Sequence, residues 1–146
     1  MSLPTPHPGL VVRHSYLWHR ESRAARESGA KDRPAAVLLV STISDGPAQR
    51  VYLLPITHAR PEDEGAAIEI PQAIKRLLNL DAERSWIMID EVNDFIWPGF
   101  DLAPIPGSNP PAFAYGTLPP TFFKTVRDAC LALIRQKRLK AVRRDD

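Results

Sequence analysis

The chain has 146 residues, including 15 prolines, 7 glycines and one cysteine. This length suits a single domain with a real hydrophobic core and is too short for two ordinary domains. Hydrophobic residues make up 44% of the chain and charged residues 25%, which excludes a globally disordered protein. The single cysteine, Cys130, cannot form an internal disulfide or anchor a zinc-ligand cluster.

The sequence predicts one domain over residues 1–146, with a flexible N-terminus at 1–8 and a basic tail at 138–146. The longest apolar run, 34–40, is far shorter than the ~20 residues that cross a bilayer. The first ten residues lack the basic segment and apolar stretch of a signal peptide. We therefore expect a soluble, cytoplasmic protein without a membrane partner.

The net charge of +2 conceals a segregation of charge along the chain. Residues 1–58 and 102–146 have an excess of Lys and Arg, whereas residues 59–101 hold ten acids against four bases. Such segregation can build a positive surface for a polyanion such as nucleic acid. It can equally reflect a solvated helix followed by a basic tail, and the charge pattern alone leaves both interpretations open.

Three strands are predicted in the first half of the chain. β-branched and aromatic residues predict a strand at 9–18, and a polar loop at 19–32 separates it from an apolar run at 34–40. The apolar run indicates a strand that is buried on both faces. A third strand covers 50–57, and Pro55 within it lacks a ladder N–H, so this strand should end, bulge or lie at an edge there.

Further strands are predicted at 67–70, 85–89 and 92–97, and residues 98–120 are predicted to be irregular because they contain seven prolines. Pro71 can open a short helix, since its missing N–H is harmless at the first helical position. The apolar face of this helix is expected to consist of Ile74, Leu77 and Leu78.

A longer helix is predicted after Pro119 and Pro120. Apolar residues recur within it at 3.6-residue spacing, as one buried face requires. These residues are Phe122, Val126, Ala129, Cys130 and Leu133. With the strands, the two helices predict an α+β fold that is mainly β: a small antiparallel barrel with a short internal helix and a C-terminal helix.

The histidines give no sign of a metal site. His7, His14, His19 and His58 lack the spacing of known metal ligands, so the sequence predicts neither a metal nor a cofactor. Nucleotide-binding glycine motifs and the serine hydrolase elbow are also missing. Cys130 falls on the apolar helix face and is therefore interpreted as a core residue and not as a nucleophile.

Polar side chains stand at the ends of two predicted strands. Arg33 directly precedes the strand at 34–40, and Thr57 ends the strand at 50–57. If these strands pair antiparallel, the guanidinium and the hydroxyl can converge on one anion. Arginine suits a phosphate because its planar fork donates two charge-assisted hydrogen bonds. The alternative is that Arg33 pairs with Asp32 at the surface and that Thr57 caps a turn.

Five segments in order carry a resemblance to a known family. They are Gly9-Leu10-Val11-Val12, Arg33-Pro34 before an apolar strand, Pro55-Ile56-Thr57, Ile68-Glu69-Ile70, and the strand at 85–89 followed by Asp90-Glu91. In this order, the region from Gly9 to about Trp97 resembles the MazF/PemK family, the ribonuclease toxins of type II toxin–antitoxin systems. The resemblance implies an SH3-like barrel, usually dimeric, that cleaves single-stranded RNA without metal.

The resemblance also implies catalytic roles for three residues. Arg33 would stabilise charge on the phosphate undergoing transfer, Thr57 would position that phosphate, and Asp90 would be the base for the ribose 2′-hydroxyl. This chemistry needs both a proton acceptor and stabilisation of the developing phosphorane charge. The expected products are a 2′,3′-cyclic phosphate and a 5′-hydroxyl.

Basic residues around the first loop predict an RNA-binding groove next to this site. They are Arg13, Arg20, Arg23 and Lys31, with His58 beside Thr57. Exposed strand edges predict a C₂ homodimer, with the groove running across both protomers. A cognate antitoxin is expected to place an acidic peptide in the same groove.

Three functions from different classes remain open at this point. The first is a sequence-selective, metal-independent endoribonuclease toxin. The second is a catalytically silent SH3-like module that binds nucleic acid, DNA included, or protein. The third is a poison of DNA gyrase, because gyrase-inhibiting toxins share a similar barrel. The pair of Arg33 and Thr57 favours RNA cleavage over the third function.

Overall fold

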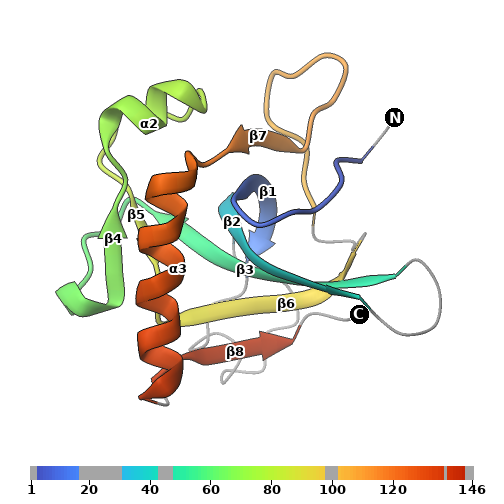
Figure 1. Cartoon of the computed structure of the whole chain (residues 1–146). Coiled ribbons are helices and arrows are strands. Elements are labelled where there is room, and N and C mark those ends of the chain that lie inside the picture. Colours follow the sequence, from blue (N-terminus) through green and yellow to red (C-terminus); the bar gives the residue numbers. More distant parts are fainter. Residues whose placement is uncertain (1–2, 17–30, 43–47, 98–101, 137, 144–146) are drawn as a thin grey trace.

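A computed structural model describes residues 3–16, 31–42, 48–97, 102–136 and 138–143 of the chain. These residues form eight strands and two α-helices, and the fold belongs to the α+β class, as predicted (Figure 1). The strands are β1 (Leu10–Tyr16), β2 (Lys31–Thr42), β3 (Gln49–Thr57), β4 (Ala67–Glu69), β5 (Trp86–Met88), β6 (Glu91–Trp97), β7 (Ala114–Thr117) and β8 (Lys140–Arg143). The helices are α2 (Gln72–Leu77) and α3 (Pro120–Arg135), with a 3₁₀ turn η1 (Glu64–Ala66) before β4.

The strands form one sheet with the order β4-β5-β3-β2-β1-β7. β6 pairs with β3 and also with β8, and β6–β8 is the one parallel pair among the described strands. Within the described residues, β4 and β7 end the path without pairing to each other, so the sheet is not closed. The α+β class is therefore confirmed, whereas the closed barrel stays a prediction.

β3 changes partner along its length, and Pro55 lies where it does so. One edge of β3 pairs with β6 as far as Leu53 and with β5 from Ile56 onward. On the other edge β3 pairs with β2, where Pro55 stands opposite Ala35. Pro55 therefore falls between the residues of β3 that pair with β6 and those that pair with β5. β3 does not end at Pro55, because it continues to Thr57 and keeps its pairing with β2, but on this one edge Pro55 has no partner among the described strands.

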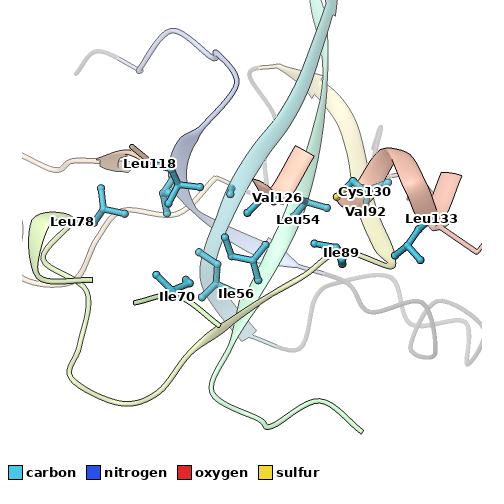
Figure 2. Packing of buried hydrophobic residues seen from close by; sticks show 13 residues of the cluster. Leu54, Ile56, Ile70, Leu78, Ile89, Val92, Leu118, Val126, Cys130 and Leu133 are labelled. Atoms are coloured by element: carbon cyan, nitrogen blue, oxygen red, sulfur yellow. The ribbon is translucent and has the colours of Figure 1, made fainter. Parts of the chain in front are cut away.

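Helix α3 covers one face of the sheet. Its residues Val126, Cys130 and Leu133 are buried against Leu54 and other apolar side chains of the strands, as Figure 2 shows. Phe122 and Ala129 are partly buried against the same cluster. The apolar face predicted from the 3.6-residue spacing is confirmed. In Figure 1, α3 crosses in front of β3 and β6.

The opposite face of the sheet carries a second apolar cluster. It contains Val37 of β2, Val51 and Leu53 of β3, and Phe95 of β6, all of which are buried. Successive residues of a strand point to opposite faces, so Leu53 belongs to this cluster whereas its neighbour Leu54 belongs to the cluster under α3. The predicted burial on both faces is confirmed for Ala35, Ala36 and Val37, whereas it is wrong for Leu39, which is 50% exposed.

Two strands lie where the sequence predicts none. β7 falls within the region 98–120, which was predicted to be irregular, and it pairs with the edge of β1. β8 falls within the predicted basic tail and pairs with β6. Both segments are four residues long, and their extended form depends on a neighbouring strand edge that local sequence does not reveal.

Gly116 in β7 is required by its surroundings. Its φ is +140°, which L side chains rarely adopt, and an added Cβ would lie 2.9 Å from the Leu78 side chain. This close approach brings β7 near the end of α2, and both elements lie at the same end of the molecule in Figure 1. No helix in the described part of the chain is both long and apolar enough to span a bilayer.

Candidate functional site

A pocket of about 520 Å³ lies where the ends of several strands meet α2. Strands β1 and β2 contribute Arg13, Asp32 and Arg33, and the end of β3 contributes Thr57 followed by His58. Lys75 of α2, Asn79, Asp81 and Ser85 of the segment after it, and Tyr115 of β7 complete the polar lining. The four strands that line the pocket, β7, β1, β2 and β3, are neighbours in the sheet, so residues that are far apart in the sequence meet there.

Arg33 and Thr57 are brought together by the pairing of β2 with β3. The antiparallel register places Ala35 opposite Pro55 and Ala36 opposite Leu54. Extended by two residues, this register places Arg33 opposite Thr57, and both residues line the pocket. The antiparallel pairing that the sequence analysis required for their convergence is present.

The hydroxyl of Thr57 also has a local role. Its oxygen accepts a hydrogen bond from the N–H of Ala59 at 3.1 Å, so Thr57 caps the turn that follows β3. The alternative prediction, that Thr57 caps a turn, is therefore confirmed for its side-chain oxygen. The hydroxyl hydrogen is not used in that bond, and it remains available to donate to a ligand in the pocket.

Arg13 lines the pocket in a fixed orientation. Its Nη1 donates a hydrogen bond to the hydroxyl oxygen of Tyr115, with a distance of 3.2 Å. Arg13 was predicted to bind RNA, and Tyr115 is a site residue that the sequence analysis missed because it lies in the unpredicted strand β7. Lys31 lies in β2, opposite Tyr16 of β1. Arg20 and Arg23 lie outside the described residues.

Lys75 is the most unexpected member of the site, because its side chain is only 1% exposed. Its Nζ donates hydrogen bonds to Asp81 Oδ1 at 2.8 Å, to Ser85 Oγ at 2.7 Å and to the backbone carbonyl of Glu83. Three oxygens therefore compensate for the burial of the ammonium group. Leu77, predicted on the buried face of this helix, is instead 65% exposed. The prediction for Leu77 is wrong because Lys75 takes the buried position, its aliphatic stem packed inside.

His58 lies between two carboxylates. Its Nε2 is 2.8 Å from Asp81 Oδ2 and its Nδ1 is 3.1 Å from Glu83 Oε2. The imidazolium form donates a hydrogen bond to each of them. Desolvation acts to raise the pKa of Asp81, but the hydrogen bond from Lys75 and the charges of His58 and Lys75 outweigh it, so this pKa is lowered. Asp81 is thus ionised at neutral pH.

The same three side chains could hold a metal ion. The donor atoms of His58, Asp81 and Glu83 all lie within 4.8 Å of one another, and they are the one such group of three among the described residues. The sequence spacing of the histidines gave no hint of this group, because its two acids come from the segment after α2. Lys75 already donates a hydrogen bond to Asp81, and His58 lies between the two carboxylates.

Asp90 does not line this pocket. Its backbone carbonyl accepts a hydrogen bond from the N–H of Lys140, just before β6 and β8 pair, and its Oδ1 is buried without a hydrogen-bond partner among the described residues. Burial and the charge of Asp90 raise the pKa of Cys130 to about 12. Cys130 is fully buried, as predicted for a core residue, and stays a thiol at neutral pH. Of the three predicted catalytic residues, Arg33 and Thr57 thus line the pocket and Asp90 does not.

The arrangement can bind an anion and move protons. Arg13, Arg33 and Thr57 line the pocket, and so do His58, Asp81 and Lys75, in which Asp81 lies within ion-pair distance of the other two. Comparisons with models of protein families, with curated protein sequences and with solved structures give no match to this chain.

Proposed function

We propose that this protein is a metal-independent endoribonuclease that cleaves single-stranded RNA by attack of a ribose 2′-hydroxyl on the adjacent phosphate. The observation that supports it best is the presence of Arg33 and Thr57, from two paired strands, in one pocket together with Arg13. Guanidinium groups bind phosphate oxygens in charge-assisted pairs, and they stabilise the extra charge that builds up during transfer. An SH3-like barrel, a C₂ homodimer and a role as a toxin belong to the same proposal.

Asp32 is the proton acceptor in this proposal. The resemblance assigns this role to Asp90, but a base must come within hydrogen-bond reach of the proton that it removes. Among the described residues that line the pocket, the carboxylates are Asp32 and Asp81. Asp81 already accepts hydrogen bonds from Lys75 and His58, whereas Asp32 is exposed and directly precedes Arg33.

The reaction then balances with groups from the pocket alone. The 2′ oxygen bonds to phosphorus while its proton passes to the carboxylate of Asp32. The bond between phosphorus and the 5′ oxygen breaks, and the 5′ oxygen takes a proton from the His58 imidazolium. The products are a 2′,3′-cyclic phosphate and a 5′-hydroxyl.

Incubation of the purified protein with labelled single-stranded RNA of random sequence tests this proposal directly. We expect fragments that end in a 2′,3′-cyclic phosphate, identified by their resistance to phosphatase until acid opens the ring. Arg76→Ala is the matched control, because Arg76 is an exposed arginine of α2 that does not line the pocket. Fragments formed by wild type and by Arg76→Ala but not by Arg33→Ala support the proposal, and intact RNA in every reaction contradicts it.

A second candidate function is a nucleic-acid-binding module without catalytic activity. The position of Asp90 outside the pocket favours it, because the base implied by the resemblance then does not reach a ligand beside Arg33. Expression in a bacterial host distinguishes the two functions. Growth arrest with RNA decay supports the enzyme, and normal growth together with RNA binding by the purified protein supports the module.

A further inference from the structure

The pocket brings together charged side chains from two parts of the fold. Arg13, Asp32 and Arg33 come from β1 and β2, whereas Asp81 comes from the segment after α2 and lies beside Lys75 and His58. Thr57 at the end of β3 also lines the pocket. A ligand that reaches Asp81 needs a hydrogen-bond donor there, because an ionised carboxylate only accepts.

Lys75 holds the carboxylate of Asp81 in place. Asp81 Oδ1 accepts hydrogen bonds from Lys75 Nζ at 2.8 Å and from the N–H of Glu83 at 3.1 Å. Lys75 is buried and is itself fixed by Ser85 and by the carbonyl of Glu83. The acceptor on this side of the pocket is therefore preorganised, which lowers the cost of binding a ligand to it.

Asp81 can accept another hydrogen bond. Each carboxylate oxygen has two lone pairs. Those of Oδ1 are used by Lys75 and the N–H of Glu83, whereas Oδ2 has His58 as its partner at 2.8 Å and retains a second lone pair. The side chain of Asp81 is 52% exposed, so a ligand in the pocket can approach it.

We propose that Asp81 selects the base next to the scissile phosphate by accepting a hydrogen bond from an exocyclic amino group. This inference rests on the proposed function and names the specificity of the same site. Cytosine, adenine and guanine carry exocyclic amino groups, whereas uracil has a carbonyl oxygen where cytosine has its amino group, and its one donor on the pairing edge, N3–H, lies between two carbonyl oxygens that a carboxylate repels. The volume of about 520 Å³ lies in the range that holds a ligand of nucleotide size. RNA with an amino-bearing base at this position is therefore the preferred substrate.

The experiment measures the binding of 2′-fluoro hexamers of cytidine and of uridine, which lack the attacking hydroxyl and stay intact. We expect wild type to bind the cytidine hexamer about tenfold more tightly, as one hydrogen bond to a charged group provides. Asp81→Asn keeps an oxygen for Lys75 and is expected to lose this preference. Glu83→Gln is the matched control, because Glu83 also contacts His58 but does not line the pocket, and it is expected to keep the preference.

A second measurement uses wild type alone and so does not depend on the folding of any variant. In it, 2-pyrimidinone replaces cytosine in the hexamer, which removes only the amino group, and we expect the tenfold advantage over uridine to disappear. Equal binding of cytidine and uridine by wild type, or an unchanged preference in Asp81→Asn, overturns the inference. Absence of cleavage of ordinary RNA with the cytidine preference intact overturns the proposed nuclease and leaves base selection standing.

Discussion

Arg13 and Tyr115 join β1 to β7 across the wall of the pocket, with a distance of 3.2 Å between Arg13 Nη1 and the tyrosine oxygen. An arginine held in this way loses less conformational entropy when it binds a phosphate. We expect Tyr115→Phe, which removes only the hydroxyl, to raise the KM for RNA several-fold and to change kcat little. Steady-state cleavage kinetics check this, and a fall in kcat with unchanged KM would contradict a positioning role for Tyr115.

Arg33→Ala is expected to lower the rate of RNA cleavage by at least about 100-fold, as the loss of one donor to a developing oxyanion does. Because Arg33 is half-buried, a modest decrease in Tm accompanies the loss of activity. Cleavage by Arg33→Ala at the wild-type rate would rule out the proposed role of Arg33.

Thr57→Val is expected to lower the cleavage rate less than Arg33→Ala does, since Thr57 offers a single neutral hydrogen bond. Thr57→Ser keeps the hydroxyl and serves as its control.

Cleavage is expected to persist in excess EDTA. The proposed proton acceptor and donor need no ion, and Asp81 already has the ammonium group of Lys75 as its partner. The measurement is the rate of RNA cleavage with and without chelator. Loss of activity that a divalent cation restores would instead assign His58, Asp81 and Glu83 to a metal centre.

Acid should weaken the fold through Asp81. Its pKa in the folded protein is lowered, so its ionised form contributes stability that is present above about pH 4, the ordinary range for an unfolded aspartate. This contribution is lost as the pH falls through the folded pKa. Thermal unfolding of wild type and Asp81→Asn should differ in Tm at pH 7, and the difference should shrink below pH 4. Because Asp81 is half-exposed, the difference is expected to be small. A constant difference over this range would contradict the ion pair with Lys75.

RNA binding is expected to weaken steeply with added salt, because bound phosphates release counterions. Arg13→Ala should reduce the slope of log K against log salt by about 1. RNA binding that does not depend on salt would refute the basic groove.

Sedimentation at micromolar concentration should show the C₂ homodimer that was predicted from exposed strand edges. A monomer would refute the dimer.

Two features of the structure could be predicted because a regular pattern in the sequence determines them. The buried face of α3 follows from the spacing of Val126, Cys130 and Leu133, and the meeting of Arg33 with Thr57 follows from antiparallel pairing of two recognisable strands. In each case hydrophobic periodicity or strand alternation sets the outcome.

The rest of the site depends on contacts between distant segments. Lys75 is buried only because Asp81, Glu83 and Ser85 fold back over it, and no pattern within α2 announces those acceptors. Tyr115 enters the pocket because β7 adds to the edge of β1. The role of Asp90 came from resemblance alone, and strand order cannot tell on which side of the sheet its carboxylate lies.

The exchange of partners along β3 has a consequence for cooperativity. β3 pairs with β2 on one edge and with both β5 and β6 on the other, so the two parts of the sheet share it. Neither part can detach without breaking hydrogen bonds to β3, and the loss of β3 dissolves both. Such shared elements open only in global unfolding, which gives their backbone amides the slowest hydrogen exchange in a protein. Thr57 and His58 follow directly at the end of this strand, so the pocket is anchored to the segment that opens last.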